Sequence, residues 1–310
     1  MTADRPLAAR VQLFTGKGGV GKTTLVAATA LAAAEAGTRP LIVELGHRAS
    51  VQSLFGVPIG HGPTDVGAGV HACNVDFDEA LLAYVVDHVR FRPLARRLTE
   101  LPTLQRFFRA APAVSEVVTL RYLEDLAAET HRGLPRWDPL LVDLDATGHA
   151  LMFLALPEVF EGLAEQGPLR DALDRFTALL SDAERTRLHL VTLPAPLPTQ
   201  ETLELHAALA ARKGHTSVPL GALLVNRMPM PPLGDVPRES LEALGPDFRA
   251  DVALADRAFA RFDEARACVA RLREEVSLPA VVLPEHRALR HALTLEHVAG
   301  LGRTLREALA

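Results

Sequence analysis

Short apolar runs alternate along the chain with stretches of helical spacing. Six runs rich in Leu, Val and Ile are each followed by turn residues: Val11–Phe14, Leu41–Leu45, Leu140–Leu144, Leu188–Leu193, Leu220–Asn226 and Ala280–Leu283. Runs that are apolar throughout fit strands covered on both faces, and strands that alternate with helices form parallel sheets. The pattern therefore predicts an α/β fold with a doubly wound, mainly parallel sheet.

The stretch from Asp76 to about Trp137 contains no such run, and its apolar residues follow helical spacing instead. A second stretch with helical spacing lies within about residues 158–186. We interpret residues 76–137, together with the helices of 158–186, as a helical subdomain inserted into the connections of the sheet. Because no stretch reads as a linker, we expect residues 1–310 to form a single domain.

Composition excludes several classes of protein. The 310 residues are 48% hydrophobic, and the formal net charge of −5 gives no general attraction to nucleic acid or to anionic membranes. The first residues lack a signal pattern, and no apolar run approaches the roughly 18 residues of a spanning helix, so we expect a cytosolic protein. Cys73 and Cys268 are the only cysteines, which leaves no disulfide framework and no CxxC metal pair.

A phosphate-binding pattern follows the first apolar run. The segment Gly16-Lys17-Gly18-Gly19-Val20-Gly21-Lys22-Thr23 satisfies G-x-x-x-x-G-K-[ST] and precedes the alanine-rich helical stretch Leu25–Ala36. Glycines let backbone N–H groups surround phosphate oxygens, and the start of the helix adds positive potential. The pattern assigns Lys22 to the β- and γ-phosphates and the Thr23 hydroxyl to Mg²⁺, and it includes Thr24 in the nucleotide site. It predicts ATP and Mg²⁺ as cofactors.

The lysine directly after the first glycine makes the pattern more specific. KGGVGKTT resembles the deviant phosphate loop of the dimeric ATPases that include MinD, the ParA partition proteins, the nitrogenase iron protein and the arsenite-pump ATPases. The resemblance implies that Lys17 reaches the nucleotide of a partner subunit. It also implies an ATP-dependent homodimer, or a heterodimer with a paralogous ATPase. The alternative is that Lys17 is a solvated surface residue.

The segment VDLDATGHALMFLALP, residues 142–157, indicates one branch of these ATPases. It resembles the switch segment DTAPTGHTLRxLxLP of the arsenite-pump and tail-anchored-protein-targeting ATPases. The resemblance places Asp143 near Mg²⁺ and makes Gly148 and His149 candidate switch residues. In two later segments, LLVNRM and LPAVVLPEH, it implies that Asn226 recognises adenine and that Leu283, Pro284 and Glu285 lie near the base.

One catalytic position departs from the family pattern. The family carries an aspartate after its second strand that positions the attacking water, and in an ungapped comparison this position falls on Gly46. Loss of the water-orienting group should slow hydrolysis and leave binding largely intact. Asp145, two residues after Asp143, is our candidate replacement, and Glu44 is a second carboxylate on the strand before Gly46. The predicted catalytic residues are therefore Lys17, Lys22 and Asp145.

The sequence does not identify a client. The four methionines do not form a methionine-rich groove for apolar helices, and two distant cysteines make a poor thiolate site for arsenite. We therefore expect a slow ATPase whose nucleotide-driven closure controls an unknown protein client. The alternatives are a non-hydrolysing switch, a degenerate subunit of a heterodimer, or a positioner that binds DNA or lipid; the sequence gives no strong sign of nucleic-acid binding or of stable membrane insertion.

Overall fold

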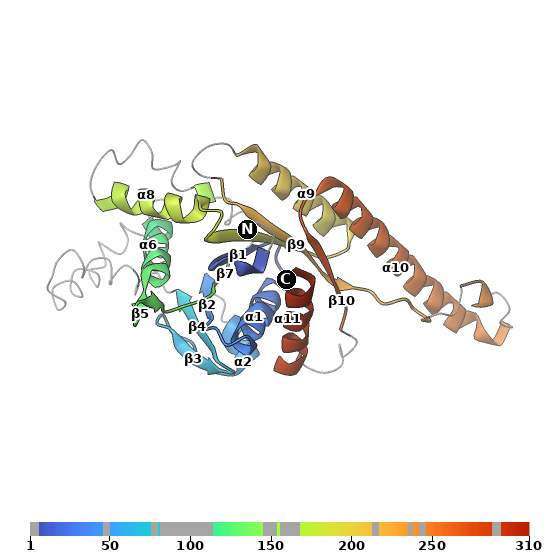
Figure 1. Cartoon of the computed structure of the whole chain (residues 1–310). Helices are drawn as coiled ribbons and strands as arrows, with labels where there is room; N and C mark the ends of the chain where they lie inside the picture. Colours follow the sequence, from blue (N-terminus) through green and yellow to red (C-terminus); the bar gives the residue numbers. More distant parts are fainter. Residues whose placement is uncertain are drawn as a thin grey trace, which may run out of the picture.

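The computed structural model of the protein describes residues 6–45, 50–75, 80, 114–144, 154–155, 168–212, 217–234, 238–241, 246–286 and 293–309. Eight strands form one sheet in the order β10-β9-β8-β1-β7-β2-β4-β3 (Figure 1). Their bounds are β1 Val11–Thr15, β2 Leu41–Leu45, β3 Thr64–Gly67, β4 Val70–Val75, β7 Leu140–Asp143, β8 Thr186–Thr192, β9 Leu220–Met228 and β10 Ala280–Pro284. All neighbours pair in parallel except β3 and β4. The predicted α/β fold with a mainly parallel sheet is confirmed.

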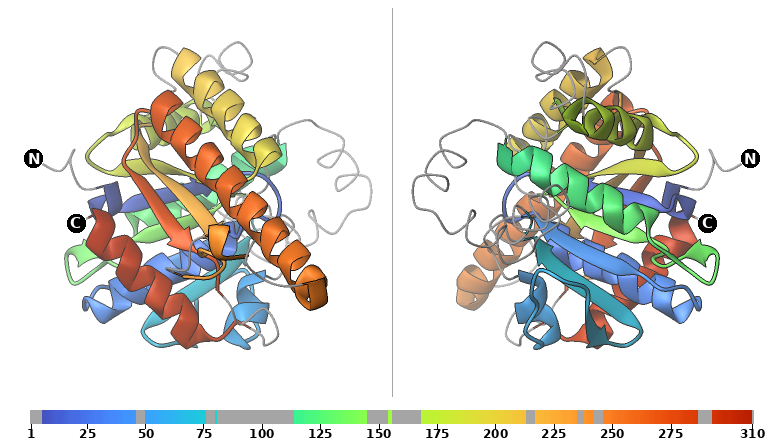
Figure 2. Two further views of the ribbon diagram at one scale, coloured as in Figure 1. Left: turned by 90° about the vertical axis from the view of Figure 1, so that its right-hand side faces the viewer. Right: turned by 90° about the vertical axis from the view of Figure 1, so that its left-hand side faces the viewer.

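Helices cover both faces of the sheet (Figures 1 and 2). One face packs against α1 (Lys22–Glu35), α2 (Ser50–Phe55) and α11 (Leu295–Leu309). The other face packs against α6 (Val114–Ala128), α8 (Pro168–Ser181), α9 (Pro196–Ala211) and the second half of α10 (Arg249–Glu275). Three short 3₁₀ helices are η1 Pro6–Ala8, η2 Arg238–Leu241 and η3 Pro246–Phe248. The sheet is therefore doubly wound, with a hydrophobic core on each side.

The edge hairpin β3–β4 is absent from the sequence prediction. β4 reads VHACNV, so His71 and Asn74 interrupt its apolar run, and β3 exposes two of its four residues. A further hairpin of β5 (Thr130–His131) and β6 (Leu134–Pro135) lies where the sequence predicted only helix. Both of its strands are exposed, so they carry no hydrophobic signal.

The predicted helical subdomain is described only in part. Helices α6 and α8 have helical spacing as expected, whereas residues 81–113 lie outside the described residues. Within the predicted helical range of about 158–186, α8 covers Pro168–Ser181, and β8 begins at Thr186. The division of the chain into one domain with an insertion stays a prediction. Within the described ranges, no helix combines the length and the apolar character needed to cross a lipid bilayer.

Helix α11 approaches α1 closely. Gly302 faces α1 so tightly that a Cβ atom there would lie 2.1 Å from the carbonyl oxygen of Ala28. On the α1 side the contact surface is made largely of alanine, and Ala27 and Ala28 are fully buried. The small residues let the two helix backbones come together and fix α1, the helix that begins at the phosphate loop.

Candidate nucleotide site

Strand β1 positions the phosphate loop. Its five residues are all buried at the centre of the sheet, and the loop connects its end to the start of α1 at Lys22. A Cβ on Gly16 would lie 2.1 Å from the carbonyl oxygen of Val191 in β8, so this position requires a glycine. By contrast, a Cβ on Gly18 or Gly19 would meet no atom within 4 Å. The loop is therefore tightly packed at its base and open at its tip.

Gly21 closes the loop with a conformation that favours glycine. Its φ is +94°, and a Cβ there would lie 2.3 Å from Nδ2 of Asn226. Leu25 N–H donates to the Gly21 carbonyl at 3.1 Å, so the helix begins directly after this residue. The first turn of α1 thus lies at the loop, and the backbone N–H groups at the start of a helix favour an anion there.

The side chain of Lys22 lies across the loop. Its Nζ donates to the carbonyl oxygens of Gly16 at 3.0 Å and of Lys17 at 3.3 Å. This arrangement places an ammonium group beside the loop amides and the start of α1. The predicted phosphate-binding residues, Gly16 to Thr24, are therefore brought together, with Lys22 as the charged group.

Thr23 and Asp143 meet at the loop although 120 positions separate them. The hydroxyl Oγ1 of Thr23 donates to Oδ2 of Asp143 at 2.5 Å. Asp143 ends β7, which pairs with β1, and its side chain is buried. A hydroxyl and a carboxylate are hard oxygen ligands of the kind that Mg²⁺ takes together with water and phosphate oxygens. The two predicted metal ligands therefore fit Mg²⁺, and the described residues contain no group of three or more His, Cys, Asp or Glu side chains that could hold a different metal.

Glu44 lies beside Asp143 in the β2–β7 register, but its carboxylate binds backbone and side-chain donors of the protein. Its Oε1 accepts the backbone N–H groups of Ser50 at 2.8 Å and Val51 at 3.3 Å, and Oε2 accepts Nδ2 of Asn74 at 3.1 Å. Burial raises the pKa of Glu44, while these hydrogen bonds act in the opposite direction. Because both carboxylate oxygens are engaged, Glu44 caps α2 and ties it to β4.

Asn226 connects the loop to the end of β9. Its Nδ2 donates to the carbonyl of Val20 at 2.9 Å, and its Oδ1 accepts the backbone N–H of Arg227 at 3.0 Å. The side chain is buried, with 4% exposed. The residue that the resemblance assigns to adenine thus lies directly against the phosphate loop.

The three residues predicted beside the base have different surroundings. The Leu283 side chain is fully buried in the core under α1 and α11, so only its backbone could approach a ligand. Pro284 is exposed. The Glu285 carboxylate accepts Nη2 of Arg261 at 2.8 and 2.9 Å, and its N–H donates to the Met228 carbonyl at 2.7 Å. The ends of β9 and β10 are therefore joined next to Asn226.

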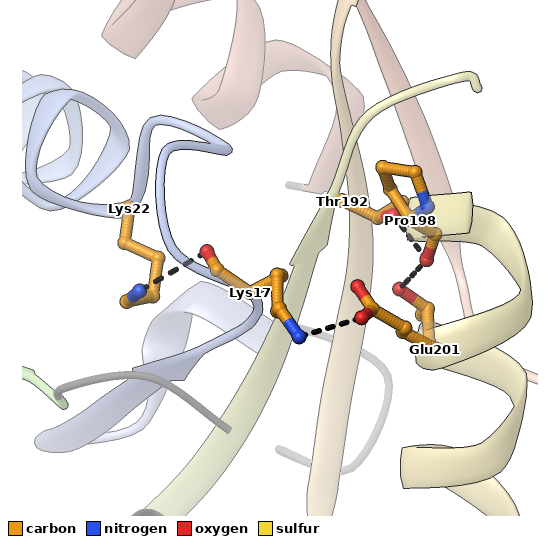
Figure 3. Close-up of polar contacts among 6 residues, drawn as sticks. Lys17, Lys22, Thr192, Pro198 and Glu201 are labelled. Atoms are coloured by element: carbon orange, nitrogen blue, oxygen red, sulfur yellow. Dashed lines mark hydrogen bonds and ion pairs between the residues drawn. The ribbon is translucent and has the colours of Figure 1, made fainter. Parts of the chain in front are cut away.

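Lys17 contacts a residue that sequence reasoning missed. Its Nζ lies 2.6 Å from Oε1 of Glu201 in α9 (Figure 3). The first turn of α9 is fixed by the hydroxyls of Thr192 and Thr202, which donate to the Pro198 carbonyl at 3.1 and 2.7 Å. The only sequence signal was an acidic residue in the helix that follows β8, because the pairing depends on how that helix packs.

Several predicted residues fall outside the described part of the chain. These are the candidate base Asp145, the departure at Gly46 and the switch candidates Gly148 and His149. Both cysteines are buried and free, one in β4 and the other in α10. Burial raises the pKa of Cys73 to about 12, so its thiol stays protonated and is a poor soft-metal ligand.

Comparison with known proteins shows that this chain is similar to ATPases. The sequence model of the anion-transporting ATPase family matches residues 9–167, just over half of the chain. ATPase BagA of Mycobacterium tuberculosis is 31% identical over 225 residues, which cover 70% of this chain and 65% of BagA. The arsenical pump-driving ATPases of Acidiphilium multivorum and Escherichia coli are 30% and 29% identical over 218 and 219 residues. Each of these matches covers 64% of this chain and 36% of the pump-driving ATPase.

Proposed function

Because this chain belongs to the anion-transporting ATPase family, we propose that it binds ATP with Mg²⁺ and hydrolyses it slowly as a dimer. In this proposal, closure of the dimer around nucleotide controls a client or partner protein. The observation that carries the proposal is the contact of 2.5 Å between Thr23 and Asp143 beside the phosphate loop. It brings two oxygen ligands to the place where the loop would hold the β- and γ-phosphates.

In this proposal the loop and the residues next to it have separate roles in binding the nucleotide. The loop amides and the start of α1 bind phosphate oxygens, and Lys22 exchanges its carbonyl acceptors for the β- and γ-phosphates. Thr23 and Asp143 hold Mg²⁺, which when bound neutralises charge on the transferring phosphoryl group. Asn226 stays beside the loop to contact the base.

We assign Lys17 to the partner subunit's nucleotide. Its side chain is 55% exposed, so it can leave Glu201 without opening the core. The partner would be a second copy of this chain or a paralogous ATPase. The client stays unidentified. Cys73 and Cys268 do not meet in a thiolate site for arsenite, because β4 lies near one end of the sheet and α10 packs against α9 and β9 near the other.

Hydrolysis depends on how the chain replaces the family's aspartate at position 46. Glu44 is engaged with the α2 backbone and Asn74, so Asp145 remains our candidate for orienting the attacking water. Gly46 itself favours a second candidate function, a non-hydrolysing nucleotide switch or the degenerate subunit of a heterodimer. In both cases ATP and Mg²⁺ would bind at the same loop.

Equilibrium binding of ATP with and without Mg²⁺ tests the shared part of the proposal. We expect Lys22→Ala to weaken ATP binding about ten- to a hundred-fold, as expected for a lost charged hydrogen bond. Asp143→Asn should remove most of the Mg²⁺ dependence and leave Mg²⁺-free binding near that of the parent. The control is Asp263→Asn, the same change at an exposed carboxylate of α10. An ATP affinity that changes neither with Mg²⁺ nor in Lys22→Ala would refute the proposed site.

A further inference from the structure

Arg227 places a cationic side chain beside the phosphate loop. It follows Asn226 at the end of β9, and it is exposed. Its Nη2 lies 3.9 Å from the point that a Cβ on Gly21 would occupy. The guanidinium group therefore stands next to the last residue of the loop, although neither the loop pattern nor the adenine-side residues discussed above include it.

The backbone at Arg227 is held in an unusual conformation. Its φ is +57°, a left-handed value that residues with a Cβ rarely adopt. The Asn226 amide supports this turn, because its Oδ1 accepts the Arg227 N–H at 3.0 Å while its Nδ2 donates to Val20 at 2.9 Å. One side chain thus fixes both the loop and the turn, and the position of Arg227 relative to the loop is built into the fold. Strained turns of this kind are concentrated at functional sites.

Other cationic residues near the site already have acceptors. Lys17 pairs with Glu201, Lys22 donates to two carbonyls, and Arg261 binds Glu285. Among the residues that the structure describes, the guanidinium group of Arg227 donates no hydrogen bond and forms no ion pair. Its donors and its planar face are therefore available for a ligand.

The position of Arg227 favours the base over the phosphates. The loop binds phosphate with its N–H groups, whereas Asn226 is bonded to a loop carbonyl, that of Val20. Asn226 and Arg227 therefore lie at the Val20–Gly21 end of the loop, whereas the Lys22 ammonium group lies at the carbonyls of Gly16 and Lys17. Arg227 directly follows the residue that is assigned to adenine. A planar, weakly hydrated guanidinium group stacks well on an aromatic ring. Building on the proposed function, we propose that Arg227 is a nucleotide-binding residue whose guanidinium group stacks on the adenine base of ATP.

Equilibrium binding to two probes, ATP and inorganic tripolyphosphate, tests this proposal. In Arg227→Gly, glycine accepts the positive φ without strain, so the melting temperature should equal or exceed that of the parent chain. We expect its dissociation constant for ATP to rise roughly two- to thirty-fold, the range of a cation stacked on a ring. Its affinity for tripolyphosphate should not change. The control is Arg273→Ala, which removes an exposed arginine from the last turn of α10.

The outcomes separate this proposal from the one on which it rests. Equal weakening of ATP and tripolyphosphate binding would put the guanidinium group on the phosphates and overturn the base contact. Unchanged ATP affinity in Arg227→Gly would remove Arg227 from the nucleotide site altogether. If the parent chain bound no ATP, the proposed function and the role of Arg227 would both be refuted. If the parent chain bound ATP and Arg227→Gly bound it equally well, only the role of Arg227 would be refuted.

Discussion

Lys17 and Glu201 form an ion pair within one chain, with Nζ and Oε1 2.6 Å apart. The two side chains are 55% and 23% exposed, and pairs of this kind contribute about 0.2–1 kcal/mol. The second carboxylate oxygen of Glu201 is buried and has no hydrogen-bond partner among the described residues. The pair is therefore weak enough to open when a nucleotide phosphate of a partner subunit offers Lys17 a stronger acceptor.

We expect Glu201→Gln to favour ATP-dependent dimerisation, because in this variant Lys17 does not have to break an ion pair before it reaches the partner's nucleotide. The ATP concentration for half-maximal dimer, measured by sedimentation velocity, should fall by up to about five-fold. Lys17→Ala should instead abolish the ATP-dependent dimer.

The matched control is Glu204→Gln, on the same helix, where the carboxylate contacts Gln200 and not the loop. If Glu201→Gln dimerised less readily than this control, Glu201 would support the dimer and would not hold Lys17 back.

Two glycines of α11 should respond oppositely to the same substitution. At Gly302 a Cβ would lie 2.1 Å from the Ala28 carbonyl, so Gly302→Ala must push α11 away from α1. We expect it to lower the free energy of unfolding by about 1–3 kcal/mol. At Gly300 the nearest atom to a Cβ is an arginine nitrogen at 3.9 Å, so Gly300→Ala should raise it by about 0.5–1 kcal/mol. Urea unfolding of both variants checks this, and equal effects would contradict the close helix crossing.

His189 should make the fold sensitive to acid. Burial, assisted by the nearby charge of Arg187, lowers its pKa from 6.5 to about 3. Its Nδ1 accepts the Ala222 N–H at 3.2 Å, so the ring is neutral with its proton on Nε2. Because the unfolded chain takes up a proton first, stability from the neutral ring is present above pH 6.5 and is lost as the pH falls toward 3. The expected slope is about 1.4 kcal/mol per pH unit.

His189→Asn tests this slope, because its amide oxygen can replace the Nδ1 acceptor without titrating. Urea unfolding between about pH 6 and pH 5 should show a pH dependence that is smaller by about one proton than in the parent. His131→Asn, at an exposed residue of β5, serves as the control. A slope that is the same in parent and His189→Asn would show that other groups cause the acid sensitivity.

The sequence predicted the strands whose residues are buried on both faces. β8 is an example, since all seven of its residues are buried and its apolar run reveals it. It did not predict β3 and β4, because the exposed positions of an edge hairpin break the pattern. It also did not predict the 27-residue helix α10, whose buried residues, from Ala265 to Leu272, occupy only the second half.

The candidate nucleotide site also contains features that the sequence reveals and features that it does not. The close packing of the loop glycines and the candidate Mg²⁺ ligand Thr23 can be recognised from the sequence, because Gly16, Gly21 and Thr23 follow local rules of backbone space and ligand chemistry. The positions of the Lys17 and Arg227 side chains cannot, because they depend on where α9 packs and on the left-handed backbone of Arg227 near the end of β9. These positions bring together residues from elements that are far apart in the sequence.

Steady-state phosphate release from ATP by the purified chain shows whether this chain hydrolyses ATP by itself. The blank is Lys22→Ala, which reports contaminating ATPase. We expect slow, Mg²⁺-dependent release above this blank, which Asp145→Asn then abolishes. Release equal to the blank, with ATP still bound, would contradict hydrolysis by this chain and leave it as a nucleotide switch or a subunit that needs its partner's carboxylate.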